Sequence, residues 1–168
     1  MRRLPLIAAA AAALAASAAL AQAPATVSAE LKNSTGQTVG AVIATEAPKG
    51  VLLHIEIKGL SPGWHGLHFH EKADCSKADF TSAGGHTHGG GDRVHGLLNP
   101  KANETGDLPN LYVAADGSGA TEVYSSLTTL AALKDADGSA VLIHAGADDH
   151  QTQPIGGAGA RVACAAVK

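Results

Sequence analysis

The feature of the sequence that most restricts its fold is a hydrophobic repeat with a period of two residues, which is the period of a β-strand. The repeat is clearest over residues 51–58, where branched aliphatic residues alternate with a mostly polar set. His54 belongs to the polar set, so we expect it to be a solvent-facing strand residue and not a metal ligand. Shorter segments of the same kind predict strands at residues 27–31, 39–45, 111–114, 120–124, 140–144 and 161–167.

These short strands predict an all-β sandwich or barrel, with one weak helical segment at residues 127–133. Residues 71–108 show no sustained periodicity and are rich in glycine, histidine, asparagine and aspartate. A loop of that length in a small domain is usually functional, so we expect the chemistry of the protein to lie there.

Size and charge exclude several classes of protein. The 168 residues suffice for one folded domain, and a net charge of −3 leaves no polybasic surface for nucleic acid. Charged residues make up 16% of the chain and hydrophobic residues 45%, which argues against intrinsic disorder. We therefore expect a single globular domain that does not bind nucleic acid.

Residues 1–21 have the anatomy of a secretory signal peptide. A short basic start precedes an apolar segment at residues 6–20, and an Ala-Leu-Ala sequence that ends at Ala21 fits a cleavage site. The apolar segment is shorter than the roughly 20 residues that a membrane-spanning helix needs, and no cysteine for a lipid anchor follows it. We expect a mature domain of residues 22–168 in the periplasm, without a membrane anchor. The general secretory and twin-arginine routes of export both stay open.

Export also affects the interpretation of Cys75 and Cys164, which are the two cysteines of the chain. An oxidising compartment permits a disulfide between them, whereas two buried free thiols would suit a cytosolic protein better. We therefore favour a disulfide between Cys75 and Cys164.

Nine histidines are unusual in so small a chain and suggest a metal site. His68 and His70 are two positions apart in a predicted strand, so they lie on the same face and can share one ion. His144 ends another predicted strand and can supply a third imidazole. Imidazoles without a thiolate suit Cu(II).

The long loop adds further candidate ligands. His86 and His95 supply two more imidazoles, and Asp107 supplies a carboxylate. Imidazole combined with carboxylate suits tetrahedral zinc, so the sequence indicates two kinds of metal ligand set.

Taken together, these segments resemble those of the exported bacterial copper/zinc superoxide dismutases. The resemblance extends from about residue 27 to the C-terminus, in the order that the family has. It implies a Greek-key β-sandwich or flattened barrel with long metal-binding loops, in agreement with the predicted strands. The segments that carry it are His65-Gly66-Leu67-His68-Phe69-His70, Ala83-Gly84-Gly85-His86, His95-Gly96-Leu97-Leu98-Asn99-Pro100, Gly106-Asp107-Leu108-Pro109-Asn110, Ile143-His144-Ala145-Gly146 and Gly156-Gly157-Ala158-Gly159-Ala160-Arg161-Val162-Ala163-Cys164.

The resemblance implies two neighbouring metal sites that share one ligand. His86 would be a bridging imidazolate, bound to copper through one nitrogen and to zinc through the other. His95 and Asp107 would supply further zinc ligands. The copper ligands implied are four histidines: His68, His70, His86 and His144.

The sequence departs from the family at the third zinc histidine, because the position three residues before Asp107 is Glu104. We expect Glu104 to complete the zinc site, since a carboxylate oxygen is an ordinary zinc ligand. The alternatives are that His88 supplies the fourth ligand, or that zinc is absent and copper works alone.

Further roles are implied by the resemblance. Asp148 would link the two metal sites through hydrogen bonds to ligand histidines, and Arg161 would receive the anionic substrate beside copper. The disulfide between Cys75 and Cys164 would hold the long loop against the barrel. His65 would be structural.

The lysines that follow the first histidine segment have two interpretations. Lys72 and Lys77 could steer the substrate, and they could equally be ordinary solvated lysines. His150 is expected to be a loop residue without a role as ligand.

The activity implied is the dismutation of superoxide to oxygen and hydrogen peroxide, by alternate reduction and reoxidation of a histidine-bound copper. A copper carrier is the first alternative, but carriers typically bind Cu(I) through methionine or cysteine, and the one methionine here is Met1. A non-catalytic sandwich is the second, and it is disfavoured because every copper position is filled. The sequence does not decide between a monomer and a homodimer.

Overall fold

The first three strands form a meander, as the alternating residues predict. In the computed structural model, which describes residues 23–168, β1 (Thr26–Asn33), β2 (Thr38–Ala47) and β3 (Gly50–Lys58) pair antiparallel in sequence order. Along β3, buried aliphatic residues alternate with partly or fully exposed ones, and the side chain of His54 is 41% exposed. The prediction of a solvent-facing His54 is confirmed. The predicted signal peptide lies outside the described residues.

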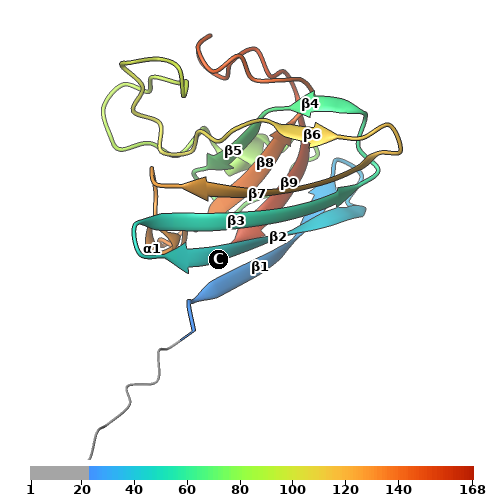
Figure 1. The fold of residues 1–168 in the computed structure, drawn as a ribbon, viewed down its shortest axis with the longest axis horizontal. Coiled ribbons are helices and arrows are strands. Elements are labelled where there is room, and N and C mark those ends of the chain that lie inside the picture. Colours follow the sequence, from blue (N-terminus) through green and yellow to red (C-terminus); the bar gives the residue numbers. More distant parts are fainter. Residues whose placement is uncertain (1–22) are drawn as a thin grey trace, which may run out of the picture.

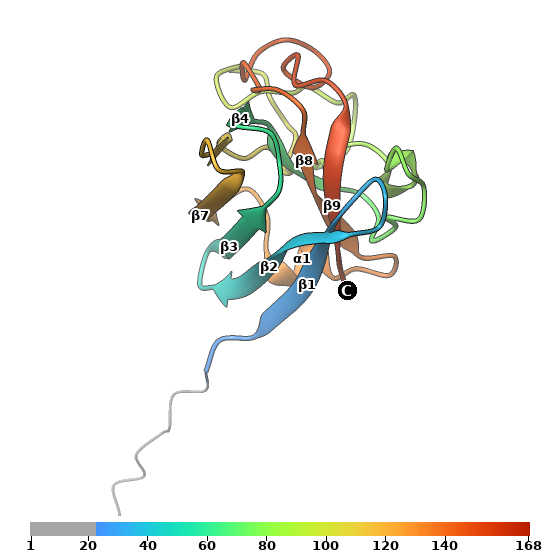
Figure 2. The same ribbon diagram turned by 90° about the vertical axis from the view of Figure 1, so that its right-hand side faces the viewer.

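These strands belong to a seven-stranded antiparallel sheet with the order β5-β8-β9-β1-β2-β3-β7 (Figure 1). The sheet curves into a half-barrel, as the turned view shows (Figure 2). A separate two-stranded ribbon of β4 and β6 lies beside β7. The expected all-β fold is confirmed. The remaining strands are β4 (Gly63–His65), β5 (Leu67–His70), β6 (Leu111–Val113), β7 (Ser118–Ser125), β8 (Ser139–His144) and β9 (Arg161–Val167).

Helical structure is sparse in the described part of the chain. A 3₁₀ turn spans Thr81–Ala83, and the predicted helical segment is reduced to α1 (Leu130–Leu133). The hydroxyl of Thr129 caps α1 by accepting a hydrogen bond of 3.1 Å from the N–H of Ala132. Among residues 23–168, no helix is long and apolar enough to cross a membrane.

The first histidine segment does not form one continuous strand. It divides at Gly66, where the chain leaves the β4–β6 ribbon and enters the main sheet as β5. A side chain at Gly66 would place its Cβ 2.8 Å from that of Ala158, so the close packing at this point favours glycine. As a result, His65 pairs with β6 in the ribbon, whereas His68 and His70 pair with β8 in the main sheet.

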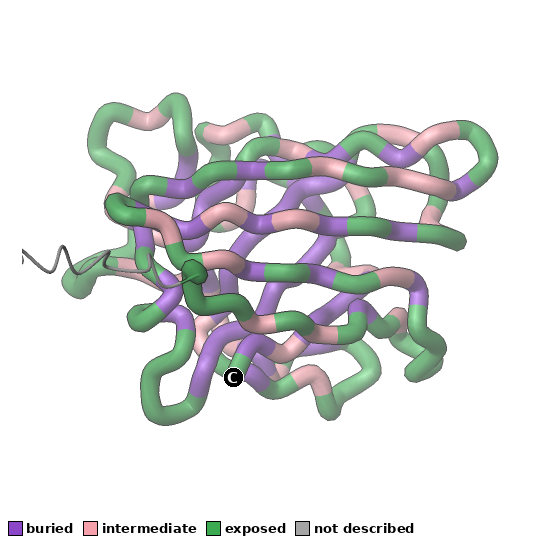
Figure 3. Tube along the Cα trace, turned by 60° about the horizontal axis from the view of Figure 1, so that its bottom comes forward, coloured by how far each residue is buried: buried purple, intermediate pink, exposed green. Residues whose placement is uncertain are grey.

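The hydrophobic core lies inside the half-barrel, and Figure 3 shows how buried and exposed residues alternate along the long strands. Leu67 and Phe69 of β5 point into this core together with Val141 and Ile143 of β8. The opposite faces of these two strands are also buried, so every residue of β5 and β8 is buried. A strand that is buried on both faces can hold polar ligands out of contact with water.

A smaller apolar cluster covers that outer face. It consists of Phe80, Ala83, Ala140, Leu142 and Cys164. Cys164 forms a disulfide with Cys75, at a sequence separation of 89 and a Cα–Cα distance of 5.9 Å. The predicted disulfide is confirmed, and it attaches the loop that follows β5 to β9.

Candidate metal centre

Strand register places three of the histidines together on the outer face of the sheet. His68 and His70 alternate with core residues along β5, and β5 pairs with β8, which ends at His144. The chain segment of His86 runs along the free edge of β5, since His86 forms an isolated bridge with His70. All of these imidazoles are buried. The sheet and one loop therefore bring together the four histidines that the sequence singles out.

Among residues 23–168, five buried ring nitrogens have no hydrogen-bond partner, and one of them, His150 Nδ1, is not part of this cluster. The other four are His68 Nδ1, His70 Nε2, His86 Nε2 and His144 Nε2. Ligand atoms of the four residues all lie within 4.8 Å of one another. A buried nitrogen without a partner is unfavourable, so four that converge need a common explanation. Their lone pairs fit a cation, and a set of four imidazoles suits copper.

The second nitrogen of each ring is held by a hydrogen bond, which fixes the ring. His70 Nδ1 lies 3.0 Å from the carbonyl oxygen of Gly84, and His144 Nδ1 lies 2.9 Å from that of Gly159. A carbonyl oxygen can only accept, so the proton of each ring is on Nδ1 and the lone pair is on Nε2. The two rings are thus preset as ligands.

A second set of donor atoms converges on the other side of His86. Oε2 of Glu104 lies 2.6 Å from His86 Nδ1 and 2.9 Å from His95 Nδ1. Oδ1 of Asp107 lies 2.9 Å from His95 Nδ1 and 3.4 Å from His86 Nδ1. Two imidazoles and two carboxylates around one point suit zinc. The ring of His86 lies between the two sets and offers one nitrogen to each.

The structure places Glu104, and not His88, beside the imidazoles of His86 and His95. The side chain of Glu104 is 3% exposed and faces both imidazoles. His88 is 24% exposed, and its Nε2 lies 3.5 Å from Oε1 of Glu71. Its Nδ1 accepts a hydrogen bond of 3.2 Å from the N–H of Gly90. His88 therefore points away from the set formed by His86, His95, Glu104 and Asp107.

A buried carboxylate joins the two donor sets. Oδ2 of Asp148 lies 2.8 Å from His68 Nε2, and Oδ1 lies 3.1 Å from His95 Nε2. The rings of His68 and His86 also stack, with centroids 3.9 Å apart. Asp148 thereby contacts one ring of each set, and the resemblance implies the same contacts for it.

Burial keeps three imidazoles of the first set neutral, those of His68, His70 and His144. It lowers the pKa of His68 to about 3 and that of His144 to about 4, and the neighbouring imidazoles lower them further. Burial also lowers the pKa of His70. These three rings therefore keep their lone pairs at neutral pH.

In the second set, hydrogen bonds outweigh burial and shift the pKa values so that the charged forms are favoured. Burial alone would lower the pKa of His95, but hydrogen bonds to Asp107, Asp148 and Glu104 outweigh it and raise the pKa to about 11. Burial alone would raise the pKa values of Glu104 and Asp107, but hydrogen bonds with the histidines lower both. Protons are thus held between imidazoles and carboxylates, at the point where a divalent cation can replace them.

Arg161 lies beside the first set. Arg161 and His144 line the same surface cavity of about 300 Å³. The guanidinium donates two hydrogen bonds of 2.6 Å, from Nη1 to the carbonyl oxygen of Phe80 and from Nη2 to that of Gly84. Both acceptors belong to the loop that the disulfide attaches to β9. The loop therefore fixes a positive charge at the approach to the four nitrogens.

The structure does not bring the two candidate steering lysines to this cavity. Neither Lys72 nor Lys77 is among the residues that line it, and Lys72 lines a different cavity together with Asp135 and Asp137. His65, by contrast, is buried and contacts the carbonyl oxygen of His144 through Nδ1, at 2.7 Å. This contact supports the expected structural role of His65.

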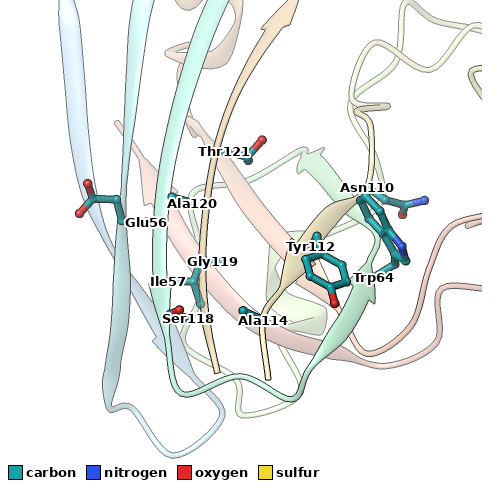
Figure 4. Close-up of a pocket in the computed structure, with 10 residues that line it drawn as sticks. All are labelled: Glu56, Ile57, Trp64, Asn110, Tyr112, Ala114, Ser118, Gly119, Ala120 and Thr121. Carbon is teal, nitrogen blue, oxygen red and sulfur yellow. The ribbon is translucent and has the colours of Figure 1, made fainter. Parts of the chain in front are cut away.

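A larger surface cavity lies elsewhere, between the β4–β6 ribbon and strands β3 and β7 (Figure 4). Its volume is about 610 Å³, and the rings of Trp64 and Tyr112 lie at its side with centroids 5.0 Å apart. Its ten lining residues include no histidine. The histidine clusters therefore lie outside this cavity, although Asn110, which is among its lining residues, also contacts the main chain of Asp148.

Sequence reasoning missed the groups that hold the ligands through the main chain. The carbonyl oxygens of Gly84 and Gly159 orient ring nitrogens, and the side chains of Asn110 and Gln153 bind main-chain groups near the site. A main-chain acceptor leaves no mark on residue type, so the sequence offers no signal for the first two. Asn110 does lie within a segment that resembles the family.

Comparisons of sequence agree with this geometry. The family described as copper/zinc superoxide dismutase (SODC) matches residues 38–167. A superoxide dismutase [Cu-Zn] of Caulobacter vibrioides is 58% identical over 149 residues, which cover 85% of this chain and 86% of the relative. Superoxide dismutase [Cu-Zn] 2 of Aquifex aeolicus is 37% identical over 146 residues, which cover 83% of this chain and 85% of the relative.

Solved structures of similar fold point to the same family. The copper/zinc superoxide dismutase from Brucella abortus has a TM-score of 0.73 and 31% identity, over 86% of this chain and 100% of that one. A superoxide dismutase-like protein from Bacillus subtilis has a TM-score of 0.74 and 36% identity, over 84% of this chain and 97% of that one. On this evidence of sequence, fold and clustered histidines, the chain belongs to the copper/zinc superoxide dismutase family.

Proposed function

We propose that the protein is a bacterial copper/zinc superoxide dismutase that works in the periplasm. Two superoxide anions and two protons are converted to oxygen and hydrogen peroxide. The observation that carries the metal chemistry is the convergence of four unpartnered ring nitrogens next to a guanidinium. Copper, when bound, supplies the electron chemistry by alternating between Cu(II) and Cu(I).

The copper ligands are His68 Nδ1, His70 Nε2, His86 Nε2 and His144 Nε2. The hydrogen bonds on the opposite ring nitrogens support this assignment, because they leave the lone pairs free on the converging atoms. His86 has a second task, since its Nε2 can take up a proton and deliver it to the reduced product. With zinc bound at Nδ1, next to the carboxylate of Glu104, the ring would stay in place during that transfer.

The zinc ligands are His86 Nδ1, His95 Nδ1, Asp107 and Glu104. The distances of 2.6 and 2.9 Å from Glu104 to the two imidazoles support the fourth ligand. Zn²⁺ with a bridging imidazolate and one aspartate sums to zero, so Glu104 makes the site −1. This additional negative charge favours Cu(II) over Cu(I) and weakly repels superoxide.

Arg161 attracts and orients the substrate. Its two hydrogen bonds to carbonyl oxygens do not neutralise it, so the guanidinium keeps its charge at the entrance to the copper site. A fixed cation beside the reacting position offsets the charge of the incoming anion. The same charge selects small anions over neutral molecules.

Export to the periplasm is supported by the disulfide, which needs an oxidising compartment to persist. Removal of residues 1–21 would leave a mature protein that begins at Gln22. The loop that carries the disulfide also holds Arg161 through the carbonyl oxygens of Phe80 and Gly84. An oxidising compartment, which preserves the disulfide, therefore also preserves the position of Arg161.

Replacement of a copper ligand tests the proposed function most simply. His144→Ala should lose nearly all dismutase activity and at least about tenfold in copper affinity, because it removes one of four ligands. Superoxide decay and copper content are measured after reconstitution with copper and zinc. His54→Ala, which removes an exposed histidine of β3, should match the parent in both. Full activity in His144→Ala would rule out this copper site.

The zinc assignment is tested by titration with Zn²⁺ against a chromophoric chelator at fixed pH. Glu104→Ala should bind zinc at least about tenfold more weakly than the parent, since a ligand is lost. His88→Ala should bind zinc as the parent does, because His88 points away from the site. If His88→Ala loses zinc and Glu104→Ala keeps it, the assignment of Glu104 is wrong.

The role of Arg161 is tested through ionic strength. Arg161→Ala should slow the reaction, and its residual rate should depend less on salt, because added salt screens the charge that the parent uses. Lys49→Ala removes an equal charge from the turn between β2 and β3 and should leave the rate almost unchanged. An unchanged rate of Arg161→Ala at low ionic strength would contradict the role.

A further inference from the structure

Two long loops meet at the metal centre, and each presents an amide side chain to the other. The first loop, residues 84–110, connects the 3₁₀ turn at Thr81–Ala83 to β6, and the second loop, residues 145–160, connects β8 to β9. Both lie at the same end of the sheet in both ribbon views (Figures 1 and 2). The first loop carries the proposed zinc ligands, and the second carries Asp148.

Gln153 of the second loop binds the main chain of His95 in the first. Its Oε1 accepts a hydrogen bond of 2.8 Å from the N–H of His95, and its Nε2 donates one of 2.8 Å to the carbonyl oxygen of His95. Both main-chain groups of one zinc ligand are thus held by a single amide. Asn99 also donates to that carbonyl oxygen, at 3.2 Å.

Asn110 of the first loop binds the main chain of Asp148 in the second loop in the same manner. Its Oδ1 accepts a hydrogen bond of 2.8 Å from the N–H of Asp148, and its Nδ2 donates one of 2.8 Å to the carbonyl oxygen of Asp148. Nδ2 also lies 3.3 Å from Nε2 of His150. The arrangement is reciprocal. The second loop holds the main-chain N–H and carbonyl oxygen of His95, and the first loop holds those of Asp148.

The two main chains also approach each other directly between these contacts. The N–H of Leu98 donates a hydrogen bond of 3.1 Å to the carbonyl oxygen of His150. Gly96 has φ +118°, and a Cβ at that position would lie 2.2 Å from the same oxygen. A side chain at Gly96 would separate the loops, so the contact requires glycine.

The side chains of His95 and Asp148 meet between the two amides. His95 Nε2 lies 3.1 Å from Oδ1 of Asp148, and both side chains are fully buried. A hydrogen bond of this kind depends on the relative position of two main chains that belong to different loops. The amides fix that relative position.

We propose that Gln153 and Asn110 form a reciprocal amide clamp that positions His95 and Asp148 for metal binding. In this clamp Gln153 is a positioning residue for zinc, because it holds a ligand without touching the metal. The proposal rests on the zinc ligands proposed above. It adds to them two residues that determine how firmly the site holds its metal.

The test compares Gln153→Met with Gln151→Met in the full mature protein. The first variant removes both hydrogen bonds to His95 at nearly constant volume. The second removes the same kind of side chain from an exposed position two residues earlier, where the described structure gives that side chain no hydrogen bond. Zinc affinity is measured with Zn²⁺ and a competing chelator, and the geometry of the site is measured from the visible spectrum of bound Co²⁺.

Gln153→Met should bind zinc about tenfold more weakly than the parent, because two hydrogen bonds of ordinary net strength correspond to about thirtyfold and part of their loss also affects the metal-free protein. Its Co²⁺ spectrum should shift, since His95 is no longer held. Gln153→Glu keeps the acceptor for the N–H of His95 but loses the donor, so it should be intermediate, and it serves the same comparison if Gln153→Met does not fold. Gln151→Met should match the parent in both measurements.

Parent affinity and an unchanged Co²⁺ spectrum in Gln153→Met would overturn the clamp, as would an equal loss in Gln151→Met. A purely structural role for Gln153 would lower the melting temperature of the metal-free protein and leave the Co²⁺ spectrum unchanged. His95→Ala separates failure of the clamp from failure of the ligand set. If His95→Ala also binds zinc as the parent does, the proposed ligands are wrong; if only Gln153→Met does, the clamp alone is wrong.

Discussion

The buried carboxylate of Asp148 is the group on which the rest of the metal centre depends. A carboxylate removed from water is unfavourable unless its oxygens accept hydrogen bonds. His68 Nε2, His95 Nε2 and the N–H of His150 supply them, at 2.8, 3.1 and 2.6 Å. These bonds hold the pKa of Asp148 well below its ordinary value in spite of burial. The carboxylate is satisfied only when the sheet and both loops are in place, so the two donor sets form together.

The sheet and the loops contribute differently to this arrangement. Strands β5 and β8 are buried on both faces, so they fix His68, His70 and His144 with the precision of a packed core. The loops have no such core and reach the site through close contacts of the main chain. At Gly156, with φ +60°, a Cβ would overlap Oδ1 of Asp148, so only glycine permits that carboxylate its position.

Much of the fold was predictable because the alternation of apolar and polar residues reports directly which face of a strand is buried. The strand pattern of residues 51–58 is an example, and the structure reproduces it residue by residue. The division of the first histidine segment at Gly66 was not predictable, because it depends on a distant packing contact with Ala158. The predicted signal peptide stays a prediction, since it lies outside the described residues.

The site was predictable to the extent that its chemistry is carried by side chains. Spacing and strand position identified His68, His70 and His144 as candidate ligands, and the long loop added His86, His95 and Asp107. The resemblance then assigned these residues to two metals. Spacing could not decide between His88 and Glu104, because loop residues have no fixed period and their direction depends on contacts such as that of His88 with Glu71. The main-chain carbonyl oxygens that orient the rings could not be predicted, because a main-chain acceptor leaves no mark on residue type.

The central claim is that two different metals occupy adjacent donor sets that share His86. Anomalous diffraction at the copper and zinc absorption edges, from crystals of the protein loaded with both metals, tests it most directly. The account predicts a copper peak beside His68 Nδ1, His70 Nε2, His86 Nε2 and His144 Nε2. It also predicts a separate zinc peak beside His86 Nδ1, His95 Nδ1, Asp107 and Glu104. A zinc peak beside His88 and away from Glu104, or both metals mixed at a single position, would contradict the account.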